Sequence, residues 1–305
     1  MARVKTAIVS PGEPDPQTKA VYGSGTTILR IGNGGAGATG LLEALCVDYL
    51  STLPSPASIT WVANHSRHTQ LALMYDYIDI ALTYERKEEA LAEAEGWSVT
   101  HGPVFHDHFC IVGPVSDPVG IRSARSPHEA LAMIARSRHL FHSRRDGSAT
   151  MWKEEDLWSY CGLKPWTDDA ENGDWFKKSH LPPAEALIGA DQAGAYLVTD
   201  RSTLLRQTGL RTISNSTVFF EPTSEYHYFM NSCCALSSPS ASPETKKHVA
   251  KFIEYLKSPR GQKVVAGYGI GDGWALFATL EEKYAKAMLR RGRPKDGRWV
   301  MPSAL

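Results

Sequence analysis

Residues 26–50 read TTILRIGNGGAGATGLLEALCVDYL and contain the pattern that decides the fold. The run from Thr26 to Ile31 is rich in β-branched residues and predicts a strand. Glycines follow it directly, and from Leu41 to Leu50 apolar residues recur at helical spacing. A strand, a glycine turn and a helix in this order form the first half of a βαβ unit.

The alternation continues along the chain and predicts an α/β fold with a mostly parallel sheet. The pattern restarts after Gly113-Pro114, and a Ser/Pro-rich linker runs from Ser237 to Pro243. We expect lobe I to hold residues 26–112 and 237–280, lobe II residues 113–236, and the termini 1–25 and 281–305 to be extensions. Strands are predicted at 59–63, 78–83, 109–112, 140–142, 194–199, 217–220 and 228–233, helices at 68–76, 87–95, 127–137, 153–161, 184–190, 244–257 and 259–268, and a loop at 163–180.

Composition excludes several classes of function. In 305 residues, Lys+Arg and Asp+Glu each number 33, so the net charge is zero and a nucleic-acid binder that relies on a positive field is not expected. No run approaches the roughly 18 apolar residues of a membrane span, so direct membrane insertion is not expected. Residues 1–25 show no apolar core of the kind a signal peptide has. Two locations remain open, the cell interior, or secretion after removal of a leader. Five cysteines without CxxC spacing do not suggest a zinc site.

The glycine loop Gly32-Asn33-Gly34-Gly35-Ala36-Gly37 matches GxGxxG between a strand and a helix. A dinucleotide site also needs a carboxylate after the second strand, where this chain has Asn64-His65-Ser66. No GK[ST] follows the glycines, which excludes a P-loop. Two interpretations remain, a plain tight turn and a loop whose backbone N–H groups hold an anion.

A second anion-binding pattern is His142-Ser143-Arg144-Arg145-Asp146-Gly147-Ser148-Ala149-Thr150, between a strand and a helix. Guanidinium groups, hydroxyls and a helix N-terminus are the donors that phosphate, sulfate, molybdate or tungstate requires. The structural alternative is a surface turn in which Arg144 or Arg145 pairs with Asp146 and Ser148 caps the helix. His101, His106 and His108 also cluster, and His106 and His108 would share one face of a strand. No third ligand stands at a clear spacing from these two, so we expect no metal site.

Several collinear segments between residues 26 and 270 resemble the tungstate-binding solute proteins of ABC importers. Phe105–Pro114 (FHDHFCIVGP) is similar to MYNDFVIVGP, and Ser143–Thr150 (SRRDGSAT) to SRGDDSGT. Gly194–Arg201 (GAYLVTDR) is similar to GAYTLTDR, and Phe252–Gln262 (FIEYLKSPRGQ) to FIDWLTSPEGQ. The family's TTTS-type first loop is Gly32-Asn33-Gly34-Gly35 here, and Arg145 stands in place of a glycine.

The resemblance implies a two-lobe fold of the type II periplasmic binding proteins, with the ligand cleft between the lobes. Arg144 and Thr150 match the family's anion-binding arginine and threonine, and Ser148 is their neighbour. The Asn64–Ser66 turn takes the place of a family turn that faces the ligand. The expected ligand-binding residues are therefore Asn33, Gly34, Gly35, Ser66, Arg144, Ser148 and Thr150.

The function expected is that of a soluble solute-binding protein for a small oxyanion such as tungstate or molybdate. No cofactor, metal or catalytic residue is expected, and the chain should be a monomer whose partner is a membrane importer. Two alternatives stay open. One is an enzyme that uses the same cleft for a phosphorylated or carboxylated substrate, and the other is a repurposed scaffold or interaction protein.

Overall fold

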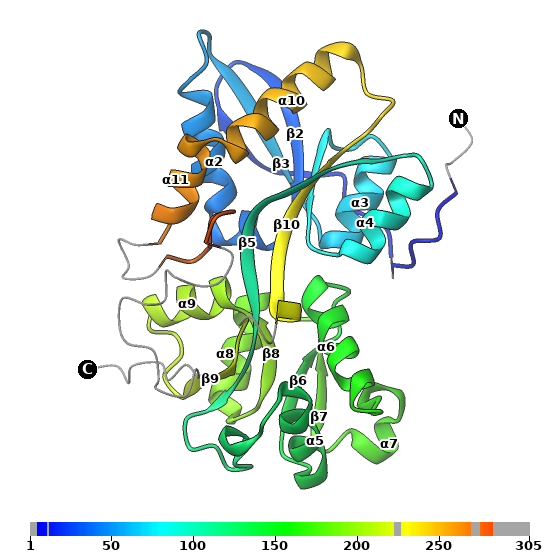
Figure 1. Cartoon of the computed structure of the whole chain (residues 1–305), viewed down its shortest axis with the longest axis vertical. Coiled ribbons are helices and arrows are strands. Elements are labelled where there is room, and N and C mark those ends of the chain that lie inside the picture. The colour runs from blue at the N-terminus through cyan, green and yellow to red at the C-terminus, as the bar shows by residue number, and fades with distance from the viewer. Residues whose placement is uncertain (1–4, 11, 223–226, 270–274, 283–305) are drawn as a thin grey trace. The chain divides into compact units, whose positions relative to one another are not determined.

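The computed structural model describes residues 5–10, 12–222, 227–269 and 275–282. They form two compact α/β units (Figure 1). Unit 1 lies within Met1–His106, Ser232–Gly271 and Phe277–Lys283, and unit 2 lies within Asp107–Asn231 and Asp272–Leu276. The chain passes from one unit to the other inside two strands, β5 and β10. The basic stretch 290–298, expected as a surface extension, falls outside the described residues.

The sheet of unit 1 has the strand order β1-β3-β2-β4-β10. β2 runs parallel to β3 and β4, whereas β1 pairs with β3 and β10 with β4 in the antiparallel sense. The expectation of a mostly parallel sheet is therefore wrong, and the sheet is mixed. The strands are β1 (Thr18–Gly23), β2 (Thr26–Asn33), β3 (Ala57–Ala63), β4 (Ile80–Thr83) and β10 (Met230–Ser237).

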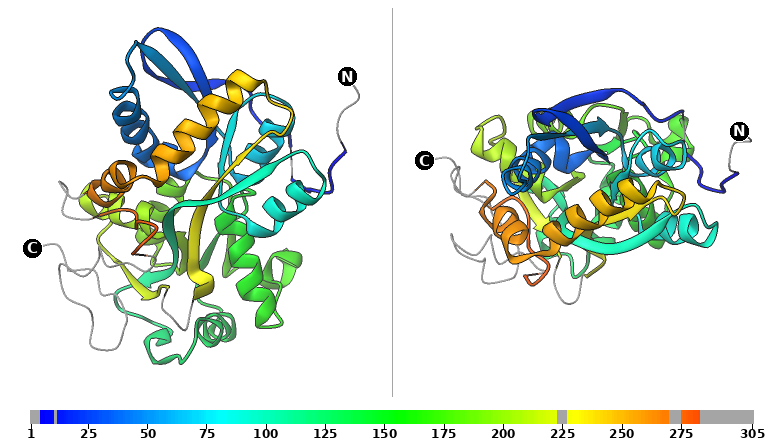
Figure 2. Two further views of the ribbon diagram at one scale, coloured as in Figure 1. Left: turned by 45° about the horizontal axis from the view of Figure 1, so that its top comes forward. Right: turned by 90° about the horizontal axis from the view of Figure 1, so that it is seen from above.

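Helix α2 packs against β1 and β3 and buries an apolar face that includes Leu41, Leu45 and Tyr49. Figure 2 shows α2 (blue) beside α10 and α11 (orange). The rings of Tyr49 and Phe252 pack edge to face, with their centroids 5.1 Å apart. This packing explains why the predicted helix at 41–50 is present with the same bounds. The helices of unit 1 are α1 (Gly35–Thr39), α2 (Leu41–Leu50), α3 (Ser66–Met74), α4 (Arg86–Ala94), α10 (Pro243–Lys257) and α11 (Pro259–Gly267).

Unit 2 contains two groups of strands. The part of β5 (Val99–Pro114) from Phe109 onward pairs antiparallel with β8 (Leu197–Asp200) and β9 (Ser216–Phe220), while β6 (Phe141–Arg144) and β7 (Phe176–Ser179) are parallel. An aromatic cluster beside β6 and β7 consists of Phe141, Trp158, Trp175 and Phe176. The helices are α5 (Pro127–Ser137), α6 (Ala149–Tyr160), α7 (Asp169–Asn172), α8 (Pro183–Ala193) and α9 (Arg201–Gly209), with 3₁₀ turns η1 (Ile121–Ser123), η2 (Pro165–Thr167) and η3 (His227–Phe229).

Several elements differ from the sequence prediction. Helices α1 and α9 were not predicted, and β5 begins ten residues before the strand predicted at 109–112. The expected loop at 163–180 contains η2, α7 and the strand β7, because Phe176 stacks on Phe141 with ring centroids 5.6 Å apart. Strand β1 was not predicted, since its residues are mostly exposed and only Tyr22 is buried. Helix α6 begins at Ala149, four residues before the predicted start, because the Ser148 side chain caps it.

Candidate functional site

The turn between β6 and α6 brings the predicted residues of unit 2 together. Ser148 is the N-cap of α6, and its hydroxyl accepts a hydrogen bond from the Met151 N–H at 3.3 Å. Asp146 Oδ1 accepts from the Ser148 N–H at 3.0 Å. The side chains of Asp146 and Ser148 therefore hold the sharp turn that leads into the helix. The first backbone N–H groups of a helix have no intrahelical acceptor and favour a bound anion.

Arg144 is the buried charge of this turn, with 3% of its surface exposed. Its Nε donates to Asp146 Oδ2 at 3.0 Å, and Nη2 donates to the same oxygen. Its Nη1 lies 3.5 Å from the Thr150 hydroxyl oxygen. The structural alternative is thus right about the partner of Arg144 and wrong about exposure, because the Arg144–Asp146 pair is buried.

Arg145 faces other groups. Its Nη1 pairs with Glu155 Oε1, and its guanidinium carbon lies 5.5 Å from the centroid of the Trp166 ring. Arg145, which replaces a glycine of the resembled family, therefore has its own acidic and aromatic partners.

A buried carboxyl group lies one helical turn beyond Thr150. Glu154 Oε1 accepts a hydrogen bond from the Ser143 hydroxyl at 2.5 Å, which links α6 to β6. Burial raises the pKa of Glu154 to about 8. Within the described residues its Oε2 has no hydrogen-bond partner, which fits a protonated, neutral group.

The glycine loop of unit 1 joins β2 to the short helix α1. Asn33 is fully buried, and its amide is used within the loop: Nδ2 donates to the Leu82 carbonyl and Oδ1 accepts from the Gly37 N–H. The Trp61 indole donates to the Asn33 carbonyl at 2.7 Å. Both ends of the Asn33 amide therefore stabilise the conformation of the loop.

Gly34 and Gly35 follow Asn33 in this loop, and only Gly35 faces open space. A Cβ atom on Gly34 would lie 2.9 Å from the Asn64 carbonyl, so the loop contacts the second predicted turn and only glycine fits there. A Cβ atom on Gly35 would meet no atom within 4 Å. Ser66, which begins α3 after that turn, is buried and accepts a hydrogen bond from the Tyr84 N–H at 3.3 Å.

The predicted site residues therefore form two local groups. Asn33, Gly34, Gly35 and Ser66 belong to unit 1, and Arg144, Ser148 and Thr150 belong to unit 2. From the sequence, Asp146 was expected only as the partner of an arginine in the structural alternative, and Glu154 was assigned no role. The pattern that could have found Asp146 is an acid two residues after an arginine and two before a helix cap.

Two of the β5 histidines, His101 and His106, contact serine hydroxyls. His106 Nδ1 lies 2.7 Å from the Ser232 hydroxyl, and His101 Nε2 lies 2.8 Å from the Ser237 hydroxyl. Among the described residues, no group of three or more His, Cys, Asp and Glu side chains is arranged to hold a metal ion. No helix in that same part of the chain is long and apolar enough to cross a membrane.

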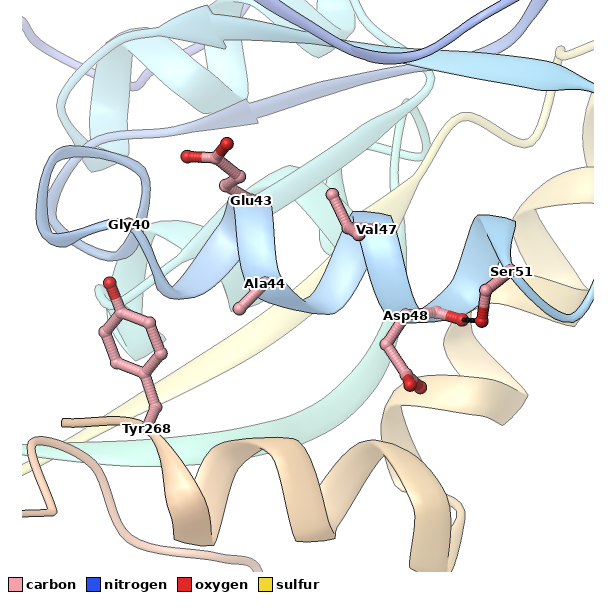
Figure 3. Close-up of a pocket in the computed structure, with 7 residues that line it drawn as sticks. All are labelled: Gly40, Glu43, Ala44, Val47, Asp48, Ser51 and Tyr268. Carbon is pink, nitrogen blue, oxygen red and sulfur yellow. Dashed lines mark hydrogen bonds between the residues drawn. The ribbon is translucent and has the colours of Figure 1, made fainter. Parts of the chain in front are cut away.

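Unit 1 also has a surface groove of about 510 Å³ along α2 (Figure 3). Glu43 and Asp48 place two carboxylates in it, and Asp48 is held by Arg260 and Tyr255. The Tyr268 hydroxyl donates to the Thr39 carbonyl at the other end. The groove contains none of the predicted ligand residues, and its carboxylates make it a poor place for an anion. Its lining residues are Gly40, Glu43, Ala44, Val47, Asp48, Ser51 and Tyr268.

Two α/β units traversed by long strands, with a buried arginine beside a helix N-terminus, define a chain of the periplasmic-binding-protein class. The chain belongs to the PBP superfamily, whose domain model matches residues 20–260. The fold class and the resemblance expected from the sequence are both confirmed.

Similar proteins are named for binding and transport. A Haloferax volcanii protein, provisionally named an ABC transporter anion-binding protein, is 29% identical over 204 residues. A crystal structure of the tungstate ABC transporter from Geobacter sulfurreducens has 26% identity and a TM-score of 0.66, covering 79% of this chain and 98% of that one. A crystal structure of a periplasmic protein with a provisional metal-binding assignment has 28% identity and a TM-score of 0.77. The match covers 86% of this chain and 98% of that one.

The match to the Haloferax protein covers 65% of this chain and 56% of that protein. This chain therefore spans little more than half of that relative's length.

Proposed function

We propose that this chain binds a small tetrahedral oxyanion of the tungstate and molybdate kind and releases it unchanged. In unit 2, Arg144, Ser148 and Thr150 supply the charge, the helix cap and a hydroxyl. In unit 1, the backbone N–H groups of Gly34 and Gly35 and the Ser66 hydroxyl supply neutral donors, and Asn33 holds their loop. The names of the relatives support this class of ligand.

One observation carries the proposal: a buried guanidinium, a hydroxyl and a helix N-terminus occur within seven residues. The first N–H groups of a helix have no intrahelical acceptor, so those of Ala149 and Thr150 remain available to a ligand. Arginine adds charge with planar donor geometry, which suits an oxyanion better than a lysine would.

Binding without catalysis is the proposal because the group consists of hydrogen-bond donors. The Ser143 hydroxyl does donate to the Glu154 carboxyl, but both side chains are buried and burial raises the pKa of Glu154 to about 8, so this pair does not present a nucleophile and a base to a ligand. We also propose that the chain acts as a monomer and delivers its ligand to a membrane importer, in line with the transporter names of its relatives.

The experiment is a thermal-shift titration with tungstate, molybdate, sulfate, phosphate and small carboxylates. An anion at 100 times its Kd should add about 2.7 kcal/mol to the free energy of unfolding. Thr150→Val should weaken the best anion by about 0.5–1.5 kcal/mol, since it removes one neutral hydrogen bond at similar volume.

Thr208→Val is the matched control, because the Thr208 hydroxyl donates to the Leu204 carbonyl within α9 of the same unit. It should leave the Kd unchanged. No shift with any anion would overturn the proposal in favour of a scaffold, and turnover of a bound compound would favour an enzyme.

A further inference from the structure

The carboxylate of Asp146 already takes the position at this turn that an anion would take. Its Oδ2 accepts from Arg144 Nε and Nη2, and its Oδ1 accepts from the Ser148 N–H. The side chains of Arg144 and Asp146 are 3% and 5% exposed. Three donors of this turn therefore hold an internal carboxylate.

The donors that remain lie on the other side of the guanidinium. Arg144 Nη1 points to Thr150 Oγ1, and the N–H groups of Ala149 and Thr150 lie in the first turn of α6. Asp146 thus fixes which edge of Arg144 a ligand meets.

Two pairs of opposite charge lie at this turn. Arg144 is balanced by Asp146, and Arg145 is balanced by Glu155. The buried Glu154 carboxyl, whose pKa is raised by burial, adds no charge near neutral pH. A ligand therefore meets dipoles and hydrogen-bond donors more than net positive charge.

Resting on the proposed function, we propose that Asp146 sets the charge selectivity of the anion site. Its carboxylate balances the charge of Arg144 inside the site. The site therefore recognises a tetrahedral anion by its shape and its hydrogen-bonding oxygens, and has little preference for a dianion over a monoanion. Coulomb energy scales with the ligand's charge, so a dianion is penalised by this carboxylate twice as strongly as a monoanion of the same size.

Tungstate and perrhenate make a matched pair of probes, because both are tetrahedral MO₄ anions of similar size and carry two charges and one. In the wild type their Kd values should lie within about tenfold of each other, since the Arg144–Asp146 pair has no net charge. Asp146→Asn should tighten tungstate by about tenfold and perrhenate by about threefold, because the logarithm of the change doubles with the charge. Isothermal titration calorimetry measures all four values.

Glu155→Gln is the control: it removes the same charge from the neighbouring pair, which is 21% and 19% exposed and therefore screened by water. It should change the tungstate-to-perrhenate ratio by less than about twofold. An unchanged ratio in Asp146→Asn, or an equal change in Glu155→Gln, would overturn this inference while leaving anion binding intact.

The wild-type ratio keeps the inference testable even where Asp146→Asn does not fold. A wild-type preference for tungstate above about a thousandfold overturns it, because a site without net charge gives no such preference. If the wild type binds neither anion, the proposed function fails together with the inference.

Discussion

At the scale of single residues, the Arg144 guanidinium takes part in two interactions, the buried pair with Asp146 and the contact with Thr150. Arg144→Ala should remove charge-assisted hydrogen bonds to the anion worth roughly 1.5–3 kcal/mol, which is one to two decades in Kd. It should also lower the free energy of unfolding by about 3–5 kcal/mol, because it removes the guanidinium that pairs with the buried Asp146 carboxylate. Urea denaturation and anion titration measure the two effects separately.

The double variant Arg144→Gln with Asp146→Asn separates ligand binding from stability. It removes both charges with little change of volume, so stability should recover most of the loss seen in Arg144→Ala. Anion affinity should stay weak, since the guanidinium is still absent. Recovery of both quantities would contradict a direct role of Arg144 in binding.

Residue patterns could identify part of this site from the sequence. Arg144, Ser148 and Thr150 were predictable because a strand, a short polar turn and a helix start occur within nine residues. The choice between Arg144 and Arg145 as the partner of Asp146 was not predictable. It depends on side-chain direction: consecutive residues of extended chain point to opposite faces, so Arg144 meets Asp146 while Arg145 meets Glu155 and Trp166.

At the scale of elements, the glycine loop and α1 depend on close packing at Gly37. A Cβ atom there would lie 2.3 Å from the Trp61 ring, whose indole N–H donates to the Asn33 carbonyl. Gly37→Ala should therefore cost about 1–3 kcal/mol of unfolding free energy through overpacking. Thermal or urea denaturation checks this value.

Gly35→Ala is the matched control in the same helix, since its Cβ atom would meet open space. The better helix propensity of alanine should make this variant neutral or more stable by up to about 1 kcal/mol. Equal losses in the two variants would mean that backbone freedom, and not the Trp61 contact, selects glycine here.

Elements with a strong apolar period were predictable, and those held by distant partners were not. Helices α2, α5 and α10 each bury one face, so their positions follow from the sequence. Strand β7 has two exposed lysines at its centre and depends on Phe176 meeting Phe141 across the β6–β7 pair. β1 likewise owes its extended form to pairing with β3. Such long-range pairings leave little trace in a local window.

At the scale of the whole molecule, buried carboxyl groups make stability depend on pH, and three of them have strongly raised pKa values. Burial raises the pKa of Glu85 and of Asp107 to about 7 and that of Glu154 to about 8. In each case the folded-state pKa lies above the unfolded value near 4, so the folded chain holds protons that the unfolded chain has released. The stability contributed by these neutral groups is complete below about pH 4 and is lost as the pH rises through 7 and 8.

The contribution of one of these acids can be measured by comparing the wild type with Glu154→Gln between pH 5.5 and 8. Glutamine keeps the shape of the side chain and the Ser143 contact but does not titrate. The free energy of unfolding of the variant should therefore fall less steeply with pH than that of the wild type, and the two slopes should differ by up to about 1.4 kcal/mol per pH unit. Burial lowers the pKa of His101, His128 and His142, which favours the folded state as the pH rises, and the difference between the two chains removes that common effect.

The control for this measurement is Glu129→Gln. Hydrogen bonding to the Arg125 N–H lowers the pKa of the partly exposed Glu129 carboxyl. That group is therefore ionised in both states throughout the range, and its replacement should leave the slope unchanged. Parallel pH profiles for the wild type and Glu154→Gln would mean that Glu154 is ionised in the folded chain. A second negative charge would then lie one helical turn from Thr150, and the neutral surroundings inferred for the anion would have to be abandoned.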